Sequence, residues 1–470
     1  MREVFVISTH MIKFSTYLDK SIKDLAAETV QACLGSAGLD KKAVQALWFS
    51  NSGWGYGKGQ DCIRGQVALR PMGIDTIPIT NVENACAGGS TAFHHAWLGV
   101  ASGLYDLTMA VGAEKLYSTN KMAIFTGFLG GIDIENCVEI AEGLSVYALN
   151  EEEKQWLAAF KRKYQPAENN GRPKKKKPVK QRAREIRDQL TVAVQLGEKL
   201  GYDTVRRMNR LSAGDHSPFM DVYGFAARQH MKKYGSTIEQ LAVIASKNHF
   251  NSTLNPAAQY NFEVPVDKVL ADRIVSFPLT RAMCAPIGDG AASAILCDEK
   301  TVKKLGLSDR AIRIRASLLG SGQERPFDSD APDIGERLAR QAYETAGVGP
   351  EDMDLAEVHD ATAFGELVQA ENLGFCARGE GGLLAEKGET GLAGRIPINT
   401  SGGLISRGHP IGASGLAQIH ELATQLRQAA GRRQVTGARL AIAENGGGAL
   451  GAEEAAMCMH ILEAPARDVT

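Results

Sequence analysis

The sequence contains no run of about 18 apolar residues, the length at which a helix begins to span a bilayer. Its 53 Lys and Arg nearly balance 54 Asp and Glu, so a net charge of −1 gives no overall reason to expect nucleic acid as a partner. The first residues, MREVFVISTHMIKF, lack the long apolar stretch and cleavage site of a signal peptide. Aromatic residues make up only 6% and mark no pocket shape. A membrane-spanning or exported protein is not expected.

The eight cysteines form no Cys-x-x-Cys pair, so this chain has no zinc-binding pattern and is expected to bind no metal. Free thiols without an export signal predict a reducing compartment, the cytoplasm. Glycine, by contrast, is abundant: the 50 glycines cluster where the backbone turns tightly or approaches a ligand. With 470 residues, 44% of them hydrophobic, the chain can bury a large core in two domain-sized units.

Strand-like runs alternate with amphipathic helical runs, which predicts an α/β fold. In the first part of the chain, the pattern predicts helices at 21–35 and 88–103 and strands at 45–51 and 107–112. In the later part it predicts helical structure at 224–249, a glycine turn, helix start and strand at 289–299, and a new unit from about 311. That unit has a strand, a helix at 333–346 and a strand at 354–360.

The regular pattern is interrupted between about 120 and 215. Residues 161–187 hold twelve Lys or Arg against two acidic residues. Three interpretations stay open for this segment: a solvated, mobile loop, a basic lip that attracts the phosphates of a ligand, or a docking surface for an acidic partner. A nucleic-acid site is disfavoured because aromatic residues are sparse there.

The two halves show a weak internal symmetry. Residues 84–103 (NACAGGSTAFHHAWLGVASG) and 401–426 (SGGLISRGHPIGASGLAQIHELATQL) each lead into a helix and then a strand. Each segment places a glycine-flanked reactive residue at a strand-to-helix transition. This repetition suggests a duplicated α/β unit.

Cys86 and His409 are the reactive residues of these two segments. At a helix N-terminus, Cys86 faces the positive end of the helix dipole, which favours thiolate over thiol. The alternative for Cys86 is a small buried hydrophobic residue. His409, between a glycine and a proline at the mouth of a helix, is poorly placed as core filling and well placed as a general base.

His359 ends a predicted strand, where α/β folds build their sites. It can donate a hydrogen bond to a substrate oxygen as negative charge develops there. The alternative for His359 is a structural hydrogen bond with Asp360.

Four segments together resemble the thiolase superfamily: NACAGGS, DGAASAIL, EVHDATAFGELVQAENLGFC and SGGLISRGHPIGASG. The resemblance is strongest to the sterol-carrier-protein-type (lipid-transfer-like) thiolases, in which a His-Asp-Cys motif replaces the Asn-Glu-Ala-Phe motif of ordinary thiolases. It covers nearly the whole chain except roughly residues 130–210. The GHPIGASG element is highly specific.

The resemblance implies a thiolase fold with five layers, αβαβα, built from two related halves with an inserted loop domain, and a homodimer as the core assembly. The first half then comprises residues 1–120 and 216–305, the basic loop domain 121–215, and the second half 306–470. The insertion falls where the family places a domain that helps to bind coenzyme A, which favours the phosphate-attracting interpretation.

The resemblance also implies residue roles. Cys86 becomes the acyl-accepting nucleophile, His409 its activating base and His359 an oxyanion-hole donor, with coenzyme A as co-substrate.

One required group is missing from this pattern. Thiolases need a second acid/base for the α-carbon, which ordinary members take from a Cys-x-Gly motif and the sterol-carrier-type branch from the cysteine after His-Asp. Here the first stretch reads Glu444-Asn445-Gly446 and the second position is Ala361. Either a water or the substrate carries the proton, or the reaction is not a standard thiolase step, or another residue substitutes. The candidate substitutes are Glu444, Asn445, Cys376 and His420.

The leading hypothesis is a thiolase that cleaves or forms a 3-oxoacyl-CoA through a Cys86 acyl-enzyme, in aromatic or steroid degradation, with a benzoylsuccinyl-CoA-type substrate as one example. Two alternatives stay open. One is a retro-aldolase of the same fold, acting on a 3-hydroxyacyl-CoA without a covalent intermediate, and the other is a non-catalytic CoA-binding scaffold. Relatives with a His-Asp-Ala motif pair with a small subunit that carries a zinc ribbon and an OB fold, so a heteromeric complex is expected.

Overall fold

The computed structural model describes residues 1–118, 128–132, 149–165, 216–326 and 329–465. In these ranges nine strands form one mixed sheet in the order β3-β2-β4-β7-β1-β8-β11-β10-β9, beside a two-stranded ladder of β5 and β6. No helix within them is long and apolar enough to cross a membrane. From residue 166 onward, the basic segment predicted at 161–187 lies outside the described residues, as does most of the predicted loop domain.

The sheet joins two sets of strands. In the first set, β2 runs parallel to β3 and β4, and β7 runs antiparallel to β4 and β1. In the second, β11 runs antiparallel to β8 and β10, and β10 parallel to β9. The sets meet where β1 pairs with β8. The strands are β1 (Val4–Met11), β2 (Ala46–Ser50), β3 (Ile79–Val82), β4 (Leu107–Lys115), β7 (Asp289–Asp298), β8 (Ile312–Ser321), β9 (Leu355–Glu357), β10 (Leu440–Gly447) and β11 (Ala456–Glu463), with β5 (Ile274–Ser276) and β6 (Leu279–Thr280) apart.

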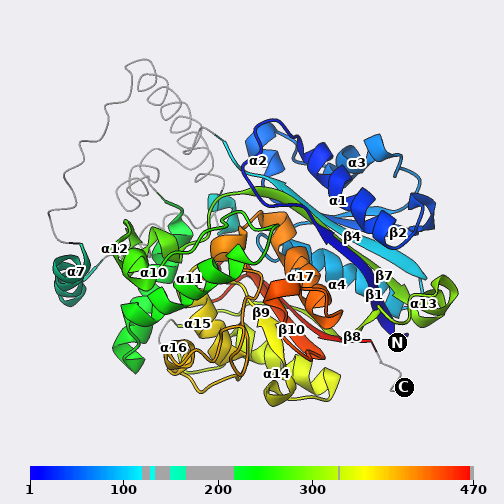
Figure 1. Ribbon diagram of the computed structural model, residues 1–470. Coiled ribbons are helices and arrows are strands. Elements are labelled where there is room, and N and C mark those ends of the chain that lie inside the picture. The colour runs from blue at the N-terminus through cyan, green and yellow to red at the C-terminus, as the bar shows by residue number, and fades with distance from the viewer. Residues whose placement is uncertain (119–127, 133–148, 166–215, 327–328, 466–470) are drawn as a thin grey trace.

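Helices cover both outer faces of the strands and fill the space between the two sets. In the centre, α4 (Gly88–Ala101) and α17 (Ser414–Leu426) pack against each other and share one core with strands of both sets. Outside, α1 (Ile22–Ser36) covers the first set, and α14 (Ile334–Ala346) covers the second (Figure 1). The layers therefore run helix, strand, helix, strand, helix, which confirms the expected five-layered α/β architecture.

The remaining helices, several of which share a further buried core, complete the described part of the fold. They are α2 (Trp54–Lys58), α3 (Arg64–Leu69), α7 (Glu151–Tyr164), α10 (Pro218–Tyr234), α11 (Ile238–Thr253), α12 (Val266–Ala271), α13 (Glu299–Leu305), α15 (Ala363–Asn372) and α16 (Gly381–Glu386).

Three predicted elements differ in the structure. The helix predicted at 224–249 is two helices, α10 and α11, because Gly235 ends the first with φ 76° and Thr237 caps the second. The helix start predicted within 289–299 is absent: all ten residues of β7 are buried and lie in the strand. The strand predicted at 354–360 stops at Glu357, so the residues after it are free to line a site.

Gly112 of β4 allows the two halves to approach closely. A Cβ atom built there would lie 2.1 Å from the carbonyl oxygen of Gly412, which is backbone and cannot rotate away. We expect Gly112→Ala to lower the free energy of unfolding by about 1–3 kcal/mol, measured by urea denaturation. Gly35→Ala is the matched control, because a Cβ there meets nothing within 4 Å. Equal stability of Gly112→Ala and wild type would contradict this close packing.

Candidate functional site

Cys86, His359 and His409 reach one point from three different elements. Cys86 lies just before α4, His409 just before α17, and His359 just after β9. Because α4 and α17 pack side by side, the loops that lead into them also meet. The sulfur and one ring nitrogen of each histidine lie within 4.8 Å of one another. The structure thus brings together all three residues that the sequence singled out.

The turn that carries Cys86 is tight and strained. Ala85 has φ 45°, a left-handed conformation that costs a non-glycine residue on the order of 1 kcal/mol. Gly447 of β10 packs directly against this turn, since a Cβ at Gly447 would lie 2.4 Å from the carbonyl oxygen of Asn84. The glycine-rich end of β10 is therefore required for the Cys86 turn to sit where it does.

His409 faces the thiol through an unprotonated nitrogen. Its Nε2 lies 3.2 Å from Sγ of Cys86, and its Nδ1 lies 2.7 Å from Oγ of Ser414. Ser414 donates its own proton to the carbonyl oxygen of Pro410 at 3.0 Å, so its oxygen accepts from Nδ1. Neutral His409 therefore carries its proton on Nδ1 and presents the lone pair of Nε2 to the thiol.

His359 presents the opposite polarity. The amide nitrogen of Asn445 donates to its Nδ1 at 3.0 Å, so the proton of neutral His359 sits on Nε2. His359 is 4% exposed. Its ring stands edge-on to the ring of His409, with the ring centroids 5.3 Å apart. The Asp360 carboxylate bonds instead to Asn248, Leu404 and Ile405. The alternative of a structural His359–Asp360 hydrogen bond is therefore wrong.

The site places a proton acceptor, His409, and a hydrogen-bond donor, His359, close to the same thiol. Such a pair can activate a nucleophile and stabilise an oxyanion. Among the described residues, these three are also the one group of His, Cys, Asp or Glu side chains whose ligand atoms lie close enough together to hold a metal ion.

The electrostatics of Cys86 differ from the expectation of a thiolate. Burial, with the nearby carboxylates Glu83 and Glu114, raises the pKa of the Cys86 thiol to about 12. Burial also lowers the pKa of His359 to about 4 and that of His409 well below its usual range. The resting pair is therefore a thiol and a neutral imidazole. Desolvation by the packed turn outweighs the helix dipole.

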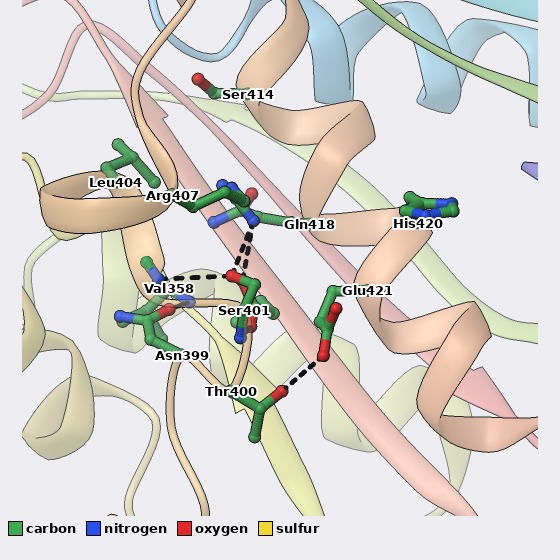
Figure 2. Close-up of polar contacts among 12 residues, drawn as sticks. Val358, Asn399, Thr400, Ser401, Leu404, Arg407, Ser414, Gln418, His420 and Glu421 are labelled. Atoms are coloured by element: carbon green, nitrogen blue, oxygen red, sulfur yellow. Dashed lines mark hydrogen bonds and ion pairs between the residues drawn. The ribbon is translucent and has the colours of Figure 1, made fainter. Parts of the chain in front are cut away.

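The four candidate acid/base substitutes separate into two groups. Glu444 accepts a hydrogen bond from the backbone N–H of His359 at 2.8 Å, and Asn445 holds the His359 ring, so both belong to the site. His420 bonds to Thr9 at 3.0 Å, and Figure 2 shows it on the side of α17 away from Gln418. Cys376 packs at the rim of the core under α14. His420 and Cys376 therefore form the second group, whose contacts lie away from Cys86, His359 and His409.

The surroundings of Glu444 favour its protonated form. Burial raises its pKa well above the usual value, and the hydrogen bond from the His359 N–H opposes this only in part. Its Oε1 is buried without a hydrogen-bond partner among the described residues. Glu444 is thus a buried carboxyl group beside His359 whose surroundings favour the protonated form.

Two further features escaped the sequence interpretation. Arg407 is fully buried and bonds to Glu357 at 2.9 Å. It also donates to Ser401 at 3.0 Å (Figure 2), and its charge helps to lower the pKa of both site histidines. Tyr223 of α10 lies close enough to Cys86 and Glu444 for both to raise its pKa. Arg407 adjoins the GHP motif and was open to inference, whereas Tyr223 carries no motif at all.

The lowered pKa of His409 sets the expected pH dependence. A base must be neutral to act, and His409 is neutral at every pH above its pKa, which lies well below 6.5. We therefore expect kcat/KM to stay constant between about pH 8 and 6.5 and to fall only at lower pH. A pH–rate profile with one substrate checks this. An acidic limb centred at or above pH 6.5 would show that His409 is not held in this environment.

Comparison with known proteins gives consistent matches. Residues 4–156 match the model "Thiolase, N-terminal domain" and residues 333–460 the model "Thiolase C-terminal domain-like". Sterol carrier protein 2 of Bos taurus is 33% identical over 451 residues, which is 94% of this chain and 69% of that protein. Benzoylsuccinyl-CoA thiolase subunit BbsB of Thauera aromatica is 30% identical over 430 residues, covering 91% of this chain and 89% of the relative.

A solved structure, the Ltp2-ChsH2(DUF35) aldolase, superposes with a TM-score of 0.69 at 19% identity, covering 99% of both chains. At 19% identity, this match shows a shared fold and nothing about function. Together with the 33% identity to a relative that is matched over 69% of its length, these findings establish the family. The chain is a member of the thiolase superfamily, in the branch of the sterol carrier protein 2 thiolases.

Proposed function

We propose that this protein is a thiolase that transfers acyl groups between CoA thioesters through an acyl-enzyme on Cys86. One observation carries the proposal: the thiol lies 3.2 Å from the unprotonated Nε2 of His409. A nucleophile within hydrogen-bond distance of a base, which a third group (here Ser414) orients, is the arrangement of covalent acyl transfer.

In the cleavage direction, Sγ of Cys86 attacks the 3-oxo carbon of a 3-oxoacyl-CoA while its proton passes to Nε2 of His409. The bond between the α-carbon and that carbon then breaks. Negative charge develops on the thioester oxygen of the departing acyl-CoA, which is where the Nε2–H of His359 donates. The products of this half are an acyl group on Cys86 and the enolate of a shorter acyl-CoA.

The enolate takes up a proton at its α-carbon, and we assign this proton to the Glu444 carboxyl group. Its raised pKa favours the protonated form, and it accepts a hydrogen bond from the backbone N–H of His359, the residue to which we assign the enolate oxygen. In the second half, the Glu444 carboxylate takes the thiol proton of incoming CoA, which attacks the acyl-enzyme. Cys86 leaves and recovers its proton from His409, so the cycle closes with no net gain or loss of protons.

The substrate is a 3-oxoacyl-CoA, and the likeness to the benzoylsuccinyl-CoA thiolase subunit supports an aromatic acyl group. Turnover of benzoylsuccinyl-CoA and aliphatic 3-oxoacyl-CoAs with CoA, followed by mass spectrometry of the acyl-CoA products, tests this. Release of two acyl-CoAs per substrate supports the thiolase. If the protein and its complex convert none of them, the proposal fails.

A retro-aldolase is the second candidate, and two observations favour keeping it. The superposed Ltp2-ChsH2(DUF35) structure is named an aldolase, and no cysteine stands at Ala361 or Glu444. A retro-aldol cleavage of a 3-hydroxyacyl-CoA yields an aldehyde or ketone plus an acyl-CoA, and it needs no thiol. Product analysis with 3-hydroxyacyl-CoA substrates separates the two reactions, and absence of both supports a CoA-binding scaffold.

The same comparison supports a complex. The solved structure is named as Ltp2 with ChsH2(DUF35), which supports a small zinc-ribbon/OB-fold subunit for this chain, and the family resemblance supports a homodimer core. A free catalytic thiol suits a reducing compartment such as the cytoplasm. Full activity of the chain alone, with nothing co-purifying from its native host, would contradict the need for a partner.

A further inference from the structure

Glu114 of β4 is a fully buried carboxylate that joins the loops carrying Cys86 and His409. Its Oε1 accepts from the Asn51 side chain at 2.8 Å and from the backbone N–H of Gly53 at 3.0 Å. Its Oε2 accepts from the N–H of Ser52 at 3.0 Å and from the N–H of Gly412 at 3.1 Å. Three of these donors come from the loop after β2, and one comes from the far half of the chain.

The first branch leads to the nucleophile. Ser52, held by its N–H, extends its hydroxyl to the carbonyl oxygen of Ala85 at 3.3 Å and to the Glu83 carboxylate at 2.9 Å. Glu83 in turn accepts from the N–H of Ala85 at 2.7 Å. Ala85 is the strained residue directly before Cys86. Glu114 therefore fixes the turn of Cys86 through two short links.

The second branch leads to the base. Gly412 lies between His409 and Ser414, in the turn Ile411–Ala413 that starts α17. Ser414 holds the ring of His409 through Nδ1. The close approach of Gly112 to Gly412 brings this N–H within reach of Glu114. Displacement of Gly412 would shift both the base and the hydroxyl that fixes its tautomer.

We infer that Glu114 is a positioning residue that holds the thiol of Cys86 and Nε2 of His409 in hydrogen-bond register across the two halves of the molecule. It touches neither of these groups and acts through the loops that carry them. The inference deepens the proposed function, because it concerns the same nucleophile and base. A glutamine at this position keeps the shape but offers one acceptor oxygen for four N–H donors, so at least one loop loses its anchor.

The test is the alkylation of Cys86 by iodoacetamide at pH 7 in Glu114→Gln, read from the Cys86 peptide by mass spectrometry. Alkylation needs no substrate, so it tests the positioning role of Glu114 even if the proposed thiolase reaction is wrong. If wild type is alkylated normally but converts no 3-oxoacyl-CoA, only the proposed reaction is rejected. Loss of the thiol–imidazole contact is expected to slow alkylation about tenfold. With a working substrate, kcat is expected to fall about 10²-fold.

The direction of the change in alkylation rate distinguishes a positioning role of Glu114 from an effect of its charge. The Glu114 carboxylate raises the pKa of Cys86, so removal of its charge alone would lower that pKa and speed alkylation. Faster or unchanged alkylation in Glu114→Gln would therefore overturn the proposal.

Asp289→Asn is the matched control. Asp289 is equally buried in the neighbouring strand β7 and accepts from the N–H groups of Tyr17 and Tyr117, but it contacts neither loop. It is expected to lose stability while Cys86 alkylation in the folded protein stays unchanged. If Glu114→Gln does not fold, Ser52→Ala tests the same link from its outer end. It is expected to slow alkylation about threefold, and an unchanged rate would refute the link.

Discussion

Replacement of Cys86 by alanine is expected to abolish thiolytic cleavage of a 3-oxoacyl-CoA, with kcat reduced by at least about 10⁴-fold. The physical reason is that Cys86 supplies the thiol that takes the acyl group: its Sγ lies 3.2 Å from Nε2 of His409 and within 4.8 Å of a ring nitrogen of His359. The measurement has two parts. One is steady-state turnover, and the other is mass spectrometry of enzyme mixed with substrate in the absence of CoA.

Wild type should show an acyl adduct on the peptide that contains Cys86, and Cys86→Ala should show none. Cys458→Ala is the matched control, since Cys458 is a buried thiol at the Thr91 side of α4 and its pKa is likewise raised to about 12. That variant should keep its adduct and its turnover. Retained cleavage in Cys86→Ala, with an aldehyde or ketone product, would replace the thiolase by the retro-aldolase.

The sequence predicted the layered fold and the three central residues because both depend on local patterns. Hydrophobic periodicity marks helices and strands, and NACAGGS and GHPIGASG each lead into a helix, α4 and α17. NACAGGS follows β3 as predicted, but the strand predicted before GHPIGASG is wrong, because a π-helical turn at Gly403–Arg407 precedes it. The break at Gly235 was present in the sequence, yet the continuous apolar pattern on both sides concealed it. The all-buried strand β7 is rich in alanine, so its composition gave no period by which to distinguish it from a helix.

The electrostatics of the site were beyond the sequence. The helix dipole at Cys86 is a local property, but the desolvation that reverses its effect comes from Gly447 and other residues far along the chain. Glu114 has no motif and becomes visible only when the loop after β2 and the turn at Gly412 meet. The position of His420 also becomes visible only in the folded chain. It lies on the side of α17 away from Gln418 and contacts Thr9 of β1.

Replacement of Glu444 by glutamine is expected to lower kcat for thiolytic cleavage by about 10²–10⁴-fold, the contribution of a general acid/base. Glutamine keeps the shape and can still accept from the N–H of His359, but it cannot give a proton to the α-carbon. Exchange of labelled CoA into an acyl-CoA without a 3-oxo group involves no carbon–carbon bond. Exchange needs Glu444 only to move the proton of the CoA thiol, which solvent water can also accept or supply, whereas cleavage needs it for the α-carbon as well. Glu444→Gln should therefore reduce exchange less than cleavage. The ratio of the two rates is the measurement.

Two further variants test whether Glu444 is the residue that gives the proton to the α-carbon. Cys376→Ser should leave both rates unchanged, because Cys376 packs under α14 and does not reach Cys86. Tyr223→Phe tests the other hydroxyl acid beside the thiol, whose pKa burial and the surrounding acidic groups raise well above 10.0. A phenol is intrinsically a much weaker acid than a carboxyl group, so Tyr223→Phe should cost less. If Tyr223→Phe loses cleavage while Glu444→Gln retains it, the proton on the α-carbon comes from α10 and not from β10.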